Sequence, residues 1–359
     1  NLIADMDLSE TFDLANVAIY LIMIRFSYLI IITQLKVSEL ERQMIIKSKI
    51  TIDFIQLANN VLSSYKVYRK SKLALLQALA LLKYYSIFSV EDGDGNDLSQ
   101  GITTNAIIAQ LALNIGLNRD PSMYQHLNQS KTKMYLHRKV WWAIVSIDKR
   151  FCSLAGVLSN FNSFFMESYC DTQFPNASDH EVDDPIELKL CDILQRSASA
   201  EAAFTQLLEM VNKVSNLPEL EEVEFQISKL DKLLKKNAFS LGDLIRIPAA
   251  SDDSNFEFQK EHDDDNSILL ICMENFKKLE LSLLAKIIKT SLYHALLIHF
   301  ESKKHEDFDK SRLYLNRLLS TIAEVCDISH NYLSHRYSVF INNTFDFHIN
   351  RLLQASVEK

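Results

Sequence analysis

Glycine and proline are scarce in this sequence. Its 359 residues include six glycines and five prolines, whereas average usage would give roughly 25 and 18. β-Sandwiches, barrels and doubly wound sheets need many turns built from these two residues, so the composition argues against all three. Hydrophobic residues make up 48% of the chain, which is enough for a large core. We therefore predict an all-α fold, a large and irregular assembly of many helices.

Closely spaced cysteines are also missing. The five cysteines lie at least 18 residues apart, and no CxxC motif occurs, which excludes the common zinc and redox motifs. Isolated thiols are typical of reducing compartments, the cytosol and the nucleus. We expect no metal site from this set: Cys152, Cys170, Cys191, Cys272 and Cys326.

An excess of positive charge is missing as well. Lys and Arg number 38 against 46 Asp and Glu, which gives a formal net charge of −8. A surface that binds nucleic acid needs a basic face, so we do not expect most of this chain to form one.

Signatures of common enzymes are absent from the sequence. Neither a GxSxG elbow nor a phosphate-binding P-loop occurs. The run Asp263, Asp264 and Asp265 is followed by Ser267 where a magnesium-binding DDxxD motif needs an acidic residue. We predict that the chain is not an enzyme and has no catalytic residues.

One long hydrophobic run, residues 17–35, carries Arg25 near its middle. An arginine at the centre of a bilayer costs about 2.5–3.5 kcal/mol, and no basic segment or cleavage site marks a signal peptide. We predict a buried core helix here and no membrane partner.

Apolar periodicity predicts five later helices. They cover residues 131–154, 218–236, 268–300, 308–328 and 330–354. Two acidic stretches, 176–185 and 251–267, are predicted to be surface loops. We predict a helical core over residues 1–175 and a C-terminal helical part over 186–359, packed into the same domain.

Charged residues lie on an apolar seam of the helix predicted over 131–154. Arg138 and Asp148 share this seam with Trp141 and Val145, and a buried charge is costly unless it is paired. Ten helical residues span about 15 Å, so these two charges cannot pair with each other.

Each charge therefore needs a partner from another element. The candidates are Asp120 or Asp171 for Arg138, and Arg119 or Arg150 for Asp148. We interpret these residues as a buried polar clamp that sets the register of a helix–loop–helix; the alternative is a catalytic or binding cluster. The only tryptophans, Trp141 and Trp142, are expected to pack in the core with one ring at its rim, the alternative being the wall of a ligand pocket.

The segment 109–175 resembles the middle homology region of fungal zinc-cluster transcription factors. In that family a helix ends in A-x-x-L-G-L-x-R-D-P, and the next helix carries R-[RK]-x-W-W with an Asp six residues beyond the second Trp. This sequence departs from the family pattern at Ile115 and at Leu158, where the family has Leu and Pro. The matching positions are Ala112, Gly116, Leu117, Arg119, Asp120, Pro121, Arg138, Lys139, Trp141, Trp142, Asp148, Gly156, Phe174 and Pro175.

The resemblance implies a regulatory helical domain. Family members read DNA through an N-terminal six-cysteine cluster that holds two zinc ions, and that cluster is expected in a part of the protein outside this sequence, since no such cysteine spacing occurs here. The chain itself is then expected to hold no cofactor. The family motif would form the structural clamp from Arg119, Asp120, Arg138, Trp141, Trp142, Asp148 and Gly156.

The functional expectation follows from the same resemblance. The chain would restrain or transmit transcriptional activation in the nucleus, by binding a small-molecule effector or a co-regulator. It would reach DNA only through the zinc cluster, and a second copy of the chain is a further candidate partner. The alternative is a helical scaffold that dimerises on DNA-bound complexes without sensing small molecules. No ligand-binding residue is predicted.

Overall fold

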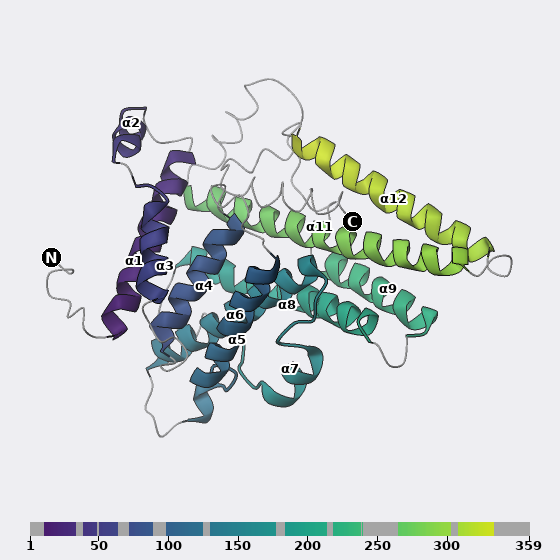
Figure 1. Cartoon of the computed structure of the whole chain (residues 1–359), viewed down its shortest axis with the longest axis horizontal. Helices are drawn as coiled ribbons and strands as arrows, with labels where there is room; N and C mark the ends of the chain where they lie inside the picture. Colours follow the sequence, from purple (N-terminus) through teal and green to yellow (C-terminus); the bar gives the residue numbers. More distant parts are fainter. Residues whose placement is uncertain are drawn as a thin grey trace. The chain divides into compact units, whose positions relative to one another are not determined.

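A computed structural model describes residues 11–33, 39–48, 50–63, 72–88, 98–124, 130–176, 184–213, 218–237, 239, 265–302 and 308–333. These residues form eleven α-helices and one 3-10 turn, with no strand among them, which confirms the all-α prediction (Figure 1). The helices are α1 (Thr11–Thr33), α2 (Glu39–Lys47), α3 (Asp53–Ser63), α4 (Leu73–Phe88), α5 (Leu98–Ile115), α6 (Lys131–Ala155), α7 (Ser163–Tyr169), α8 (Pro185–Val211), α9 (Leu220–Lys236), α11 (Asp265–Ser302) and α12 (Phe308–Leu333), and the 3-10 turn is η2 (Pro121–Met123).

The described residues group into two compact units. The first unit contains the described residues up to Asp148 together with 164–176, and the second contains Lys149–Ser163 and the described residues from 184 onward. Helix α6 therefore contributes its first part to one unit and its last turns to the other. The predicted packing of both parts into a single domain stays a prediction.

The first unit has its core between α1, α3 and α4, which lie side by side (Figure 1). Alanines at the contacts, among them Ala18, Ala58 and Ala78, let these helices approach closely. Arg25 of α1 is buried; it donates a hydrogen bond to the Ile50 carbonyl and lies over the Tyr28 ring. The described part of the run predicted as a core helix is thus part of this core.

Helices α5 and α6 both end on a glycine with positive φ. Gly116 has a φ of 81° and Gly156 a φ of 72°. After α5, the Gly116 and Leu117 N–H groups donate to the carbonyls of Leu113 and Ala112, the hydrogen-bond pattern of a Schellman C-cap. A side chain at Gly116 would meet no atom within 4 Å, so backbone conformation alone makes glycine suitable at this helix end, where the family pattern also places a glycine.

The second unit is built from long helices around α11. Helices α8, α9 and α12 contact α11, and α12 runs back along α11 as the second arm of a hairpin (Figure 1). Helices α6, α9 and α11 match their predicted ranges within three residues at each end. Helix α8, with 27 residues, was not predicted.

Several predicted boundaries need correction. The acidic loop predicted over 251–267 ends earlier, because Asp265 already begins α11, and Asp184 caps α8 at the end of the loop predicted over 176–185. Helix α12 continues to Leu333, so no break separates it from the helix predicted over 330–354. The rest of that helix and most of both loops lie outside the described residues.

One helix in the described part of the chain is long and apolar enough to cross a membrane by length and composition. It is the stretch Met273–Ser302 of α11, and 67% of its most apolar window is buried within the protein. The core helix of a soluble protein passes the same test.

Candidate functional site

The polar cluster of the first unit centres on Asp120, in the turn that follows α5. Asp120 caps the short η2 turn, and Pro121 begins that turn with a proline φ that suits it. The side chain of Asp120 is buried. The chain reversal after Gly116 thus carries a carboxylate into the interior of the first unit.

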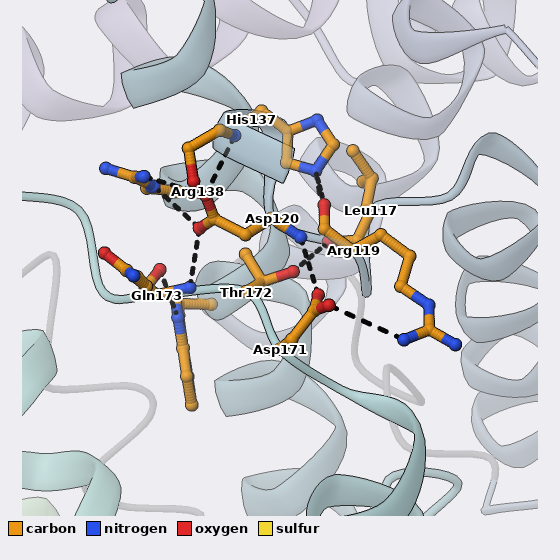
Figure 2. Close-up of polar contacts among 10 residues, drawn as sticks. Leu117, Arg119, Asp120, His137, Arg138, Asp171, Thr172 and Gln173 are labelled. Carbon is orange, nitrogen blue, oxygen red and sulfur yellow. Dashed lines mark hydrogen bonds and ion pairs between the residues drawn. The ribbon is translucent and has the colours of Figure 1, made fainter. Parts of the chain in front are cut away.

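The Asp120 carboxylate accepts five hydrogen bonds from three parts of the chain (Figure 2). Arg138 of α6 donates to both oxygens, at 2.9 and 2.8 Å. Ser122 donates its N–H at 3.0 Å and its hydroxyl at 2.6 Å, and the Gln173 N–H donates at 2.9 Å. Of the two candidates for Arg138, the partner is Asp120. We call this group, Asp120 with Arg138, Ser122 and Gln173, the Asp120 clamp.

The Asp120 clamp keeps its carboxylate ionised. Burial by itself would raise the pKa of Asp120, but the hydrogen bonds from Arg138, Ser122 and Gln173 outweigh burial and hold the pKa well below its ordinary value of 3.8. Two parallel donors on a planar guanidinium make the pair with Arg138 both strong and directional.

An extended piece, residues 170–176, lies against the turn after α5. Asp171 accepts the Asp120 N–H at 2.7 Å and forms an ion pair with Arg119 at 3.5 Å. The Thr172 hydroxyl donates to the Leu117 carbonyl at 2.7 Å. Together with the Asp120 clamp, these contacts join three segments: the turn after α5, α6 and the extended piece (Figure 2).

His137 lies beside the clamp and contacts the same turn. Its Nε2 atom is 3.0 Å from the Arg119 carbonyl oxygen and 3.2 Å from that of Leu117. Since both neighbours only accept, Nε2 carries the proton and donates. Burial lowers the pKa of His137 from its ordinary value of 6.5, and the hydrogen bonds to these carbonyls oppose that shift without reversing it.

The pKa of His137 predicts a contribution to the pH dependence of stability. Because the folded state takes up this proton at a lower pH than the unfolded chain, the unfolded chain binds more protons below about pH 6.5, and stability falls as the pH decreases through that window. The variant His137→Gln keeps an N–H donor and removes the titration. Its free energy of unfolding, measured in urea between pH 7 and pH 5, should fall less than that of the wild type. Equal slopes for the two proteins would contradict the assignment.

The two tryptophans lie at different depths. Trp141 is fully buried. Burial raises the pKa of the half-buried Cys170 thiol, and the nearby Trp141 ring N–H opposes that shift without reversing it. Trp142 is partly exposed, stacks on Phe174 with ring centroids 3.8 Å apart, and donates to the Gln173 carbonyl at 2.9 Å. One ring in the core and one at its rim is the arrangement expected for core packing.

Asp148 has a partner that the sequence analysis missed. Its carboxylate accepts the Asn105 side-chain N–H of α5 at 2.5 Å, and both residues are buried. Of the cations predicted for Asp148, Arg119 pairs with Asp171, and Arg150 pairs with Glu280. Asn105 precedes the buried Ile108 and Ala112 by three and seven residues, and this polar residue on an apolar face was the available signal.

The second unit contains a buried charge cluster of its own. Arg150 donates to one oxygen of Glu280 at 2.8 Å, and Lys277 donates to the other at 3.1 Å. Lys277 also donates to Glu201 at 2.8 Å. Two cations and two carboxylates from α6, α8 and α11 thus balance each other in the interior. We call Arg150, Glu201, Lys277 and Glu280 the charge quartet. Gly156, the last residue of the predicted structural clamp, belongs to this unit as the cap of α6.

Both clusters join separate parts of the chain, and their role in setting the register of the helices stays a prediction. The carboxylates of Asp120, Asp148, Glu201 and Glu280 all accept hydrogen bonds within the fold, which is the pairing that a structural clamp requires. The described residues contain no group of three or more His, Cys, Asp or Glu side chains arranged to hold a metal ion.

Comparison with known proteins gives a family match over nearly the whole chain. The sequence model described as "Fungal specific transcription factor domain" matches residues 9–345. The chain is also similar to "Multidrug resistance regulator 1" of Candida albicans (strain SC5314 / ATCC MYA-2876), with 24% identity over 338 residues. That alignment covers 89% of this chain and 28% of the relative, so the chain spans about a quarter of the relative's length. No solved structure matches.

Proposed function

Because the chain belongs to the family of the fungal specific transcription factor domain, we propose that it is the regulatory part of a longer zinc-cluster transcription factor. The family and the similar curated protein are transcription regulators and not enzymes. In this proposal the zinc cluster and DNA binding belong to another part of the protein, and the whole acts in the nucleus. The match over 9–345 supports a regulatory role for both units together.

The observation that carries the mechanism is the pair of buried ion-pair sites on α6. Arg138 enters the Asp120 clamp of the first unit and Arg150 enters the charge quartet of the second, and both residues belong to α6. Buried ion pairs tolerate few arrangements because a broken pair leaves an uncompensated charge. An effector that binds one arrangement of the helices better than another shifts their populations, and α6 carries that shift.

The effector we propose is a small, hydrophobic, drug-like molecule, because the name of the similar regulator refers to multidrug resistance. A ligand present at 100 times its dissociation constant stabilises the folded state by about 2.7 kcal/mol. Purified chain should therefore show a higher melting temperature and slower hydrogen exchange with an active member of a drug panel. Saturating inducers that leave both readouts unchanged would count against direct sensing and favour the scaffold alternative.

Coupling through the clamp has its own test. Arg138→Lys keeps the charge and weakens the two-point contact with Asp120, so it should change the apparent affinity for an active drug by about fivefold or more. Arg119→Met, which removes only an exposed ion pair, should bind like the wild type. If both variants bind the drug with equal affinity, drug binding does not depend on the Asp120 clamp.

A further inference from the structure

Helix α12 presents a second apolar face in addition to the one it packs on α11. Its buried residues Tyr314, Thr321, Val325 and Ile328 face the core of the second unit. Tyr314 and Arg317 also donate to Glu224 of α9, at 2.6 and 2.8 Å. These contacts fix the rotation of α12 about its axis, so the same residues always lie on its outer side.

The outer face follows the spacing of a coiled coil. We call its residues the α12 seam: Phe308, Arg312, Leu315, Leu319, Ile322 and Cys326. They recur at steps of four, three, four, three and four, the spacing that lets two helices pack knobs into holes. All six are exposed, and Leu319, near the middle, is 54% exposed. A straight helix of 26 residues is about 39 Å long, enough for three heptads.

The charges along α12 are arranged in two blocks. Three cations and one carboxylate lie in residues 308–320, whereas 321–333 contain two carboxylates and no Lys or Arg. A basic first half and an acidic second half oppose the helix dipole, so stabilisation of the single helix does not explain the order. Arg317 and Glu324 pair with neighbouring helices, whereas Arg312 in the seam and Asp327 beside it are exposed.

We propose that the α12 seam pairs antiparallel with the α12 seam of a second copy of this chain. An antiparallel pair places the basic half of each helix against the acidic half of the other. With Leu319 set against Ile322 of the partner subunit, Leu315 meets Cys326 of the partner subunit, and Arg312 comes within a turn of Asp327 of the partner subunit. The contact is the same for both copies, so it closes as a two-fold dimer and is independent of effector binding.

The oligomeric state of the chain tests the surface. Sedimentation velocity over a range of concentrations should show a monomer–dimer equilibrium. Leu319→Glu, which places two carboxylates in the central layers, should weaken dimerisation by at least about 100-fold while leaving the melting temperature of the monomer unchanged. Leu57→Glu is the matched control, because Leu57 is 51% exposed on α3 and should leave the dimer intact.

Cysteine cross-linking tests the orientation. Leu315→Cys should form an intermolecular disulfide with Cys326 on mild oxidation, because the two positions on one helix are about 16 Å apart and cannot join within a chain. Leu313→Cys and the double variant Leu315→Cys/Cys326→Ser should not form it. A wild-type Cys326–Cys326 disulfide would indicate parallel pairing and overturn the antiparallel proposal. The α12 seam is not a dimer surface if the chain is a monomer at all concentrations or if the dimer survives Leu319→Glu. A large loss of thermal stability in that variant would also contradict the proposal, because it would mean that the chain covers its own seam.

Discussion

Replacing Arg138 by methionine should lower the free energy of unfolding by about 3–5 kcal/mol. The substitution leaves Asp120 buried and ionised with only Ser122 and the Gln173 N–H as described donors. Trp141 and Trp142, the only tryptophans, flank this site on α6, so their fluorescence during urea unfolding reports the loss locally. In the wild type, the lowered pKa of Asp120 gives stability that is complete above about pH 3.8 and is lost as the pH falls below it. Without Arg138 that pKa rises, so acid unfolding should begin at a higher pH.

The chain offers a matched control for this variant. Arg119 and Asp171 form an ion pair at 3.5 Å whose side chains are 47% and 41% exposed, and such pairs contribute about 0–1 kcal/mol. Arg119→Met should therefore cost little, although it removes the same residue type from the same cluster. In a double-mutant cycle, Asp120→Asn should recover part of the loss caused by Arg138→Met, because it removes the uncompensated charge. Equal losses in the two methionine variants would contradict the clamp.

Local signals explain which parts of the fold were predictable. Gly116 and the amphipathic spacing of α9 carry their information within a few residues, and both were placed correctly. Helix α8 was missed because Ser197, Glu201 and Thr205 interrupt the apolar residues of its buried face, which weakens the apolar stripe by which a helix is recognised.

Charge pairing was predictable only in part, because it depends on tertiary structure. The sequence analysis identified Arg138 as a charge on an apolar seam and named Asp120 among two candidates. It could not identify Asn105 as the partner of Asp148, since 43 residues separate them and an amide on a helix gives no charge signal. The burial of Lys277 and Glu280 could not be predicted for a related reason. Charges three residues apart on a helix usually lie on a solvated face, and only the packing of other helices on α11 buries these two.

Replacing Lys277 by methionine should be as damaging in the second unit as Arg138→Met is in the first. Lys277 donates to Glu201 and Glu280, both almost fully buried, and removing one partner of a buried pair costs about 3–5 kcal/mol. The loss should appear as a lower urea midpoint in far-ultraviolet circular dichroism. Lys286→Met is the control on the same helix, because its partner Glu324 is 49% exposed and its loss should cost at most about 1 kcal/mol.

The double variant Lys277→Met/Glu201→Gln separates charge balance from packing. If the charge quartet is stabilising because its charges cancel, removing one cation and one carboxylate together should cost less than Lys277→Met alone, with Glu280 still held by Arg150. If packing of the lysine stem dominates, the second substitution should add to the loss instead. Recovery would also mean that α6, through Arg150, stays joined to α11 when Lys277 is gone, which is the rigidity that our regulatory proposal requires of α6.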